Sequence, residues 1–241
     1  MTSFIPETIL QIGKFPVTNT VLDTILVDAV LIVTVIYLSK KIKLNPTNAI
    51  QNAVEMIIEI FYNLTESVNQ TMTATIFPYF MTFFLFILIA NWSGLIPGFG
   101  TIGFWRNGEF VPLLRAATSD LNLTLGLATI SIIATHVLSI KTIGIADYLK
   151  RYFSFNPINL FVGILEIISV FTSLVSLSFR LFGNIYAGEV VITTISAIFA
   201  FVVPLPFLAL EIIVGIVQAL VFSMLTMVNM SILMTPHEKN H

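Results

Sequence analysis

One stretch decides how this chain folds, and it reads LSFRLFGNIYAGEV over residues 177–190. Arg180 is the only lysine or arginine between Arg151 and Lys239, and its neighbours are almost all apolar. An arginine at bilayer depth costs several kcal/mol, from about 3 on insertion scales upward, so it should face a protein interior or a wet cavity. Because arginine, unlike lysine, keeps its proton there, we expect Arg180 to be a permanent charge with a functional role.

The composition indicates an integral membrane protein. Hydrophobic residues make up 56% of the chain and charged residues 10%, whereas a soluble domain carries roughly 25% charged residues. The mean hydropathy is +0.96. The chain has no cysteine, which excludes disulfides and thiolate metal sites, and its net charge of −2 gives no sign of nucleic-acid binding. The N-terminus lacks the features of a cleaved signal peptide, so we expect the first apolar run to be retained.

Several apolar runs reach the roughly 20 residues that span hydrocarbon, and no barrel-like strand pattern is present. We therefore predict an all-α integral membrane protein that forms a single membrane domain, 1–241. It should have about five membrane helices plus an amphipathic helix, and the last two membrane helices should form a long tilted hairpin. The expected segments are 21–39 (first span), 45–70 (amphipathic helix), 76–97 (second span), 120–139 (third span), and 157–203 with 207–233 (the hairpin).

The amphipathic segment begins well, because Asn45 can cap a helix and Pro46 suits its first position. Apolar side chains then recur every three or four residues from Ile50 to Val68, which is typical of a helix with one apolar face. Its polar face lacks the lysines of a lipid-binding helix, so we expect it to dock on protein. We expect residues 1–20 to be an irregular or surface-lying leader, and residues 98–118 to be a polar loop.

The distribution of lysine and arginine predicts the orientation. By the positive-inside rule, the basic cluster after the first span and the basic residues after the third span lie in the cytoplasm, with the N-terminus outside. The residues assigned to the cytoplasm are Lys40, Lys41, Lys43, Lys141, Lys150 and Arg151, and those assigned to the outside are Arg106 and Arg115.

Residues 158–203 contain no proline, and a continuous helix over them would be roughly 69 Å long. Since the hydrocarbon core is about 30 Å thick, the segment either breaks at Gly183 or Gly188 into two upright spans, or tilts strongly as one helix. We favour the tilted helix, with Pro204 and Pro206 forming the turn. Simple antiparallel counting about Pro204 then sets Gln218 closer to Glu189 than to Arg180.

Few ionisable side chains lie in the hairpin: Glu166, Arg180, Glu189 and Glu211. Glu166 is roughly 21 Å before Arg180 along a helix, and Glu189 is roughly 13 Å beyond it. A carboxylate in an apolar setting binds protons more readily than one in water. One fixed positive charge with an exchangeable carboxylate toward each membrane face could separate two aqueous inlets and stop ions from leaking through. Further polar candidates are Asn184, Gln218 and Asp120.

Structural interpretations stand beside these functional ones. Arg180 could be a structural ion pair with Glu166 or with another helix. Glu189 and Glu211 could each be satisfied by interhelical hydrogen bonds, and Asp120 could simply cap a helix. His136 is more typical of an interfacial packing residue than of a ligand.

The residues RLFGN of 180–184 followed by YAGE of 186–189 resemble the signature of subunit a of F-type ATP synthase, in its bacterial form. The resemblance covers most of the chain. It includes the end of the second span at 91–97, Asp120, Asn122 and Thr124 at the start of the third span, and Gln218, Ala219 and Phe222 in the last helix.

This resemblance implies a stator subunit of the proton channel, which carries protons through two offset half-channels to and from the carboxylates of a rotating c-ring. Arg180 matches the essential coupling arginine, and Asn184 and Gln218 match its polar neighbours. Glu189 and Glu211 match positions along the outer half-channel, with Asp120 near its mouth, and Glu166 matches a carboxylate toward the cytoplasmic exit. The family often has histidine at one of positions 189 and 211, whereas this chain has glutamate at both. Whether the ion is H⁺ or Na⁺ stays open.

The family also implies that the chain is not an enzyme on its own and needs no cofactor or metal. Its partners would be the c-ring, subunit b of the peripheral stalk and membrane lipid, without nucleic acid. Its place would be the plasma (inner) membrane of a bacterium, with the N-terminus outside and the C-terminus cytoplasmic. The alternative is an ion-coupled secondary transporter or channel, but a transporter typically shows internal repeats and broken helices, and we find no convincing repeat.

Overall fold

The computed structural model describes residues 7–12, 15–42, 49–96, 98, 101–106, 109–152, 157–198 and 202–235. Its helices are α1 (Asn19–Lys41), α2 (Ala49–Val68), α3 (Thr73–Ser93), α4 (Leu121–Ile143), α5 (Ile145–Tyr152), α6 (Pro157–Ile198) and α7 (Pro204–Met234). A short 3-10 turn, η2 (Ala117–Ser119), precedes α4. Five of the helices, α1, α3, α4, α6 and α7, are long and apolar enough to cross a membrane. The prediction of an all-α membrane protein is confirmed.

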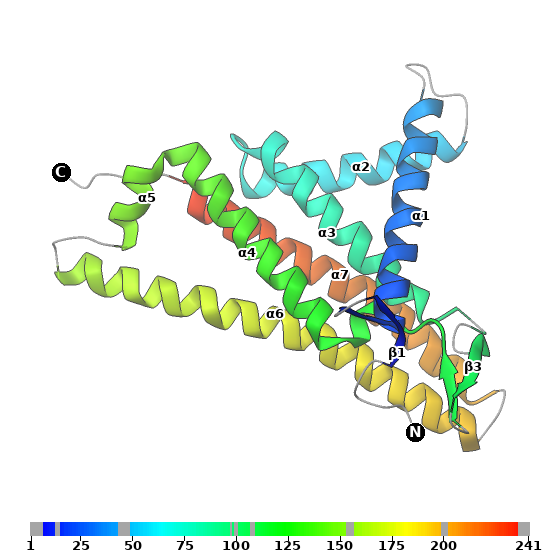
Figure 1. The fold of residues 1–241 in the computed structure, drawn as a ribbon. Coiled ribbons are helices and arrows are strands. Elements are labelled where there is room, and N and C mark those ends of the chain that lie inside the picture. Colours follow the sequence, from blue (N-terminus) through cyan, green and yellow to red (C-terminus); the bar gives the residue numbers. More distant parts are fainter. Residues whose placement is uncertain are drawn as a thin grey trace.

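The last two helices form the predicted long hairpin. Helix α6 has 42 residues, about 63 Å at 1.5 Å per residue, and it continues through Gly183 and Gly188 without a break. Helix α7 runs back along it in the opposite direction (Figure 1). A helix about twice as long as the hydrocarbon core is thick must lie strongly tilted to remain in a membrane. Helix α7 begins at Pro204 rather than at 207, because the first turn of a helix tolerates proline.

Two small hairpins differ from the expected leader and loop. Strand β1 (Thr8–Ile12) pairs antiparallel with β2 (Phe15–Thr18), and β3 (Gly103–Arg106) pairs antiparallel with β4 (Glu109–Pro112). Both lie where α1, α4 and α7 begin and α6 ends (Figure 1), which we call the outer end. The opposite end, which carries α2 and α5, is called the inner end. Lys40, Lys41, Lys141, Lys150 and Arg151 belong to helices that terminate at the inner end, and Arg106 lies at the outer end.

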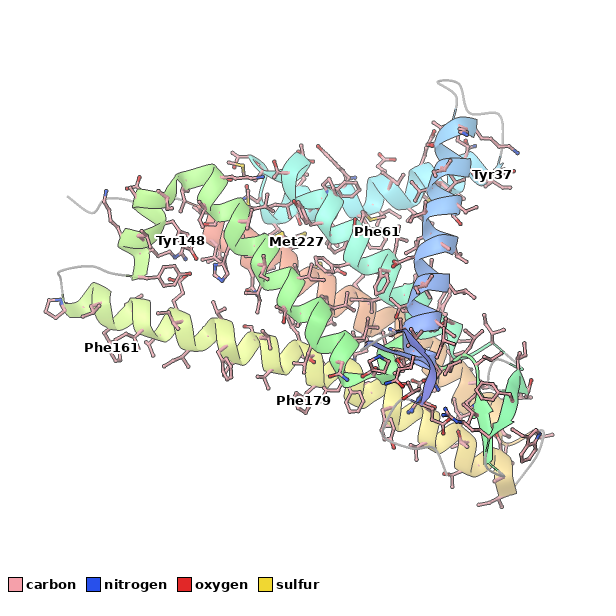
Figure 2. The ribbon with its side chains drawn as sticks, in the orientation of Figure 1. Tyr37, Phe61, Tyr148, Phe161, Phe179 and Met227 are labelled. Atoms are coloured by element: carbon pink, nitrogen blue, oxygen red, sulfur yellow. The ribbon has the colours of Figure 1, made fainter. Side chains whose placement is uncertain are left out.

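The core lies among α3, α4, α6 and α7. One cluster joins Phe83 and Ile87 of α3 to Leu181 of α6 and Phe222 of α7. A second cluster, nearer the inner end, joins Phe80 of α3 to Met227 and Met230 of α7. In Figure 2 Met227 lies inside the bundle, between α4 and α3.

Helix α2 docks on protein through one part of its apolar face only. Phe61, Leu64 and Val68 pack against the inner core cluster, and Figure 2 shows Phe61 at the junction with α3. In contrast, Ile50 and Ile57 are 73% and 48% exposed. The prediction that this helix docks on protein therefore holds for its C-terminal half within this chain.

Candidate functional site

Arg180 lies on an exposed face of α6, opposite the side that packs on the bundle. Leu177, Leu181 and Ile185 of the same helix are buried against α3, α4 and α7, whereas Arg180 and Asn184 are exposed. The guanidinium Nη2 of Arg180 donates to Ser176 Oγ at 3.3 Å, one turn earlier. No carboxylate in the described part of the chain forms an ion pair with Arg180. The alternative of a structural pair between Arg180 and Glu166 is therefore wrong.

The exposed face of α6 is mostly apolar along its length. Phe161 and Phe179 project from it away from the other helices (Figure 2) and are 62% and 53% exposed. Arg180 is thus a permanent charge on a helix face that an apolar environment would cover. Burying such a charge in an apolar environment is costly unless a protein group or water contacts it.

At the outer end, Glu189 of α6 faces a cation from a distant segment. Arg115 Nε lies 3.4 Å from Glu189 Oε1, and the two side chains are 9% and 26% exposed. Arg115 Nε also donates to Ser119 Oγ in η2, at 3.1 Å. The guanidinium of Arg115 thus lies buried between a hydroxyl and a carboxylate.

Glu211 of α7 lies directly against the backbone of α6, one position from Glu189. It is 6% exposed, and a Cβ added at Gly188 would collide with its carboxyl carbon and both of its oxygens. Glycine is therefore required at position 188 for the carboxyl to occupy this place. Glu211 and Glu189 thus share one polar region at the outer end of the hairpin.

This contact also sets the register of the hairpin. Gln218 is about 10 Å beyond Glu211 on α7, and Arg180 is about 12 Å before Gly188 on α6, at 1.5 Å per residue. Because the helices run antiparallel, Gln218 and Arg180 lie within about 2 Å of the same level. Counting symmetrically about Pro204 was wrong, because the contact between Gly188 and Glu211 shows that the two helices are offset along their length.

A second polar region lies at the inner end. Arg151 of α5 pairs with Glu166 of α6, with Arg151 Nε 2.7 Å from Glu166 Oε1, and the side chains are 10% and 18% exposed. Tyr148 Oη lies 2.8 Å from His136 Nδ1, so that α5 is fastened to both α4 and α6. Figure 2 shows Tyr148 reaching from α5 toward the bundle.

Beside these contacts is a cavity of about 350 Å³ between α4, α6 and α7. Glu166, His136 and Asn229 line it together with several hydroxyls, those of Ser131, Thr135, Ser169 and Ser173. The cavity reaches Ser173 on α6, about 10 Å before Arg180 along the helix axis. Polar lining and this volume suit water molecules.

A model of the family described as ATP synthase A chain matches residues 21–231 of this chain. This span contains both polar regions and the whole α6–α7 hairpin as far as Ser231. The chain belongs to this family.

Two relatives support the same assignment. ATP synthase subunit a of Moorella thermoacetica is 31% identical over 226 residues, which cover 94% of this chain and 95% of the relative. ATP synthase subunit a 1 of Hahella chejuensis is 32% identical over 219 residues, covering 91% and 85% of the two chains. This member of the ATP synthase A chain family is accordingly a multi-pass membrane component of the ATP synthase complex.

In this member of the family, the structure brings together some of the residues that the sequence singled out and separates others. Glu211 lies against Gly188, which precedes Glu189 in α6, and the helical rise from this contact puts Gln218 level with Arg180. Asp120 caps α4 by accepting from the backbone N–H of Asn122 at 2.9 Å, and it also accepts from Thr20 Oγ1 at 2.9 Å. Glu166 is remote from the other carboxylates and pairs with Arg151.

Sequence reasoning missed Arg115 and Asp23. The sequence places Arg115 outside without indicating a partner, and it does not single out Asp23. Asp23 is fully buried and accepts from Ser93 Oγ and from the backbone N–H of Ala117, both at 2.8 Å. It thereby ties α1, α3 and η2 together next to Arg115. In the described ranges, no group of three or more histidines and carboxylates is placed to hold a metal ion.

Proposed function

We propose that this chain is the stator subunit of the proton channel of ATP synthase, and that Arg180 is the barrier between its two half-channels. The observation that carries the proposal is the position of Arg180, exposed and without an ion-pair partner in the described part of the chain, between two polar regions. The exposed face around Arg180, Asn184 and Phe179 is the side that would meet the c-ring.

The outer half-channel leads past Asp120, Glu189 and Glu211. A proton from outside reaches a ring carboxylate by this route and neutralises it. The neutral carboxyl can then enter lipid at low cost, because desolvating a charge is the expensive step. Gln218 and Asn184 are the polar neighbours of Arg180 on the two helices of the hairpin.

The inner half-channel is the cavity lined by Glu166 and His136. After nearly a full turn of the ring, the carboxyl releases its proton there and is drawn past Arg180 as an anion. Each proton that moves down 100 mV supplies about 2.3 kcal/mol, which appears as torque on the ring. The chain itself supplies no catalytic group, since ATP chemistry takes place on other subunits.

The remaining assignments follow from the family and from charge. The N-terminus lies outside and the C-terminus in the cytoplasm of a bacterial plasma membrane, with the lysine-bearing ends of α1 and α4 inside. The c-ring, subunit b and lipid are the partners. The exposed apolar positions of α1 and of the N-terminal half of α2 are the surfaces available to subunit b or lipid.

The test is proton flux in vesicles that carry the whole complex, with Arg180→Ala compared with wild type. We expect ATP-driven acidification to be lost while passive proton leak rises, because the fixed charge no longer separates the two paths. Arg106→Ala is the matched control, since Arg106 is exposed on the outer hairpin and donates to the backbone oxygen of Thr8 at 3.2 Å. Pumping that survives Arg180→Ala would show that this arginine is structural and would overturn the proposal.

A further inference from the structure

The two glutamates at the outer end have unequal environments, although their sequence contexts look alike. Glu189 has a guanidinium beside it, with Arg115 Nε 3.4 Å from its Oε1. Glu211 has no cation within ion-pair distance in the described part of the chain. Both lie next to the same backbone, at Gly188 and Glu189 of α6. Their protonation should therefore differ.

Burial strengthens this difference. Glu211 is 6% exposed, whereas the Glu189 side chain is 26% exposed. Glu211 Oε1 and Glu189 Oε2 are both buried without a hydrogen-bond donor, but Glu189 also has Arg115 within ion-pair distance. At Glu211 an ionised carboxylate would lose its hydration without a compensating cation, whereas the neutral acid avoids most of that penalty. A neighbouring anion at Glu189 would favour the neutral acid further.

Two other carboxylates at the outer end accept hydrogen bonds from groups outside the hairpin. Asp23 accepts from Ser93 and from the backbone of Ala117, and Asp120 accepts from Thr20 and from the backbone of Asn122. Arg115 lies in the segment between β4 and η2. Because η2 packs on α6, the Arg115 side chain contacts Glu189 of α6. Among the described residues, Arg115 is the cation within ion-pair distance of a hairpin glutamate at the outer end.

We propose that Arg115 is a positioning residue that holds Glu189 ionised, so that Glu211 alone carries the exchangeable proton of the outer half-channel. This inference rests on the proposed function and assigns different roles to two carboxylates that the family resemblance treats alike. In the relay, the O–H bond of Glu211 breaks as its proton passes toward the ring carboxylate. A proton from outer water then re-forms that bond. Glu189 and Arg115 keep their charges throughout, so the net charge of the path alternates only at Glu211.

A charge-balanced pair of substitutions tests the assignment. Glu189→Gln leaves Arg115 as a buried cation without a counter-charge beside the proton path, where it repels protons. Arg115→Gln removes the cation beside Glu189, so that Glu189 can bind a proton. Each single variant should lower the rate of ATP-driven proton flux by more than about tenfold. The double variant Arg115→Gln with Glu189→Gln restores neutrality and should return to within about threefold of wild type, a non-additivity expected of contacting charges.

Three controls make the result specific. Arg115→Lys keeps the positive charge and should retain most of the flux. Glu211→Gln removes the exchangeable proton and should abolish flux both alone and in the double-variant background. The amount of assembled complex in the membrane is measured for each variant, so that flux is expressed per complex.

An infrared measurement keeps the proposal testable even if Arg115→Gln fails to assemble. In difference spectra against the wild-type complex, which cancel the band of the neutral ring carboxyls, the protonated-carboxyl C=O component of this chain should be lost in Glu211→Gln and kept in Glu189→Gln. Loss of that component in Glu189→Gln with its retention in Glu211→Gln would overturn the assignment.

The outcomes separate this inference from the function on which it rests. If Arg180→Ala still pumps, the proposed function itself is wrong. If Arg180→Ala leaks as expected but the double variant stays as inactive as Glu189→Gln, the channel assignment stands. In that case Glu189 carries the proton, and the role given to Arg115 is refuted.

Discussion

Gly188→Ala probes the contact between the two helices of the hairpin most directly. The three atoms nearest to the added Cβ are the carboxyl carbon and both oxygens of Glu211, so the new methyl group occupies the site of the carboxyl itself. An ordinary contact requires about 3.5 Å, and the carboxyl must therefore retreat by about 1 Å or more. Because the obstacle is the end of a flexible side chain, the hairpin should still form, at an overpacking cost of about 1–3 kcal/mol.

The functional cost should be seen in the rate of proton transfer rather than in assembly. A misplacement of about 1 Å in a reacting group can lower a rate by about a hundredfold, so proton flux should fall between tenfold and a hundredfold while the complex still assembles. The assay is ATP-driven acidification of vesicles, normalised to the assembled complex. Gly126→Ala in α4 is the matched control, since no atom lies within 4 Å of its added Cβ, and it should leave flux unchanged.

A compensating change sharpens the result. Glu211→Asp shortens the side chain by one methylene and withdraws the carboxyl from the new methyl group. Combined with Gly188→Ala, it should recover part of the flux that Gly188→Ala loses. Full flux in Gly188→Ala alone would refute the claim that the position of the Glu211 carboxyl limits proton transfer.

Two further predictions concern the inner end. Arg151→Ala leaves Glu166 without its cation; because the side chains are 10% and 18% exposed, the loss of stability should be about 1–3 kcal/mol, below that of a fully buried pair. Thermal unfolding of the purified complex measures this loss of stability. Lys150→Ala is the control, because the side chains of its pair with Asp147 are 73% and 68% exposed and the pair should contribute under about 0.5 kcal/mol. Equal effects of the two substitutions would contradict the prediction. Burial, and then the neighbouring phenol of Tyr148, raises the pKa of Tyr152. Its contribution to stability is therefore complete below the unfolded pKa of about 10 and is lost as the pH rises through the raised value. In an alkaline absorbance titration, Tyr152→Phe should remove the tyrosinate step that appears last, and loss of an early step instead would show that Tyr152 is accessible.

The membrane fold could be predicted because hydrophobicity and length act locally. Apolar runs long enough to span hydrocarbon are visible in the sequence itself, and so is the unbroken run that becomes α6. Arg180 was visible for the same reason, since a charge within such a run has no local explanation. The two small hairpins were missed because four- and five-residue strands carry too little periodicity to stand out.

The pairing of charges could not be predicted, because it depends on tertiary packing. Arg115 and Glu189 come together only when η2 packs on α6. Glu166 had a candidate partner on its own helix in Arg180, but α5 supplies Arg151 instead. Helical geometry predicts which residues share a face of a helix, but it does not predict which neighbouring element supplies the counter-charge.

The packing around Arg180 explains how one residue could divide the path. The inner cavity ends at Ser173 on α6, and the outer carboxylates begin at Gly188 and Glu189. Between these levels, the inward face of α6 presents Leu177, Leu181 and Ile185 to a phenylalanine-rich cluster from α3 and α7, and the buried Ser178 Oγ lies 3.0 Å from Thr124 Oγ1 of α4. In the proposed mechanism a proton crosses this interval along the exposed face of α6, which carries Arg180. Under the proposed function, the apolar cluster limits proton passage inside the hairpin and the fixed charge of Arg180 limits it on the exposed face. A carboxyl carried by the c-ring is then the proposed route between the two ends.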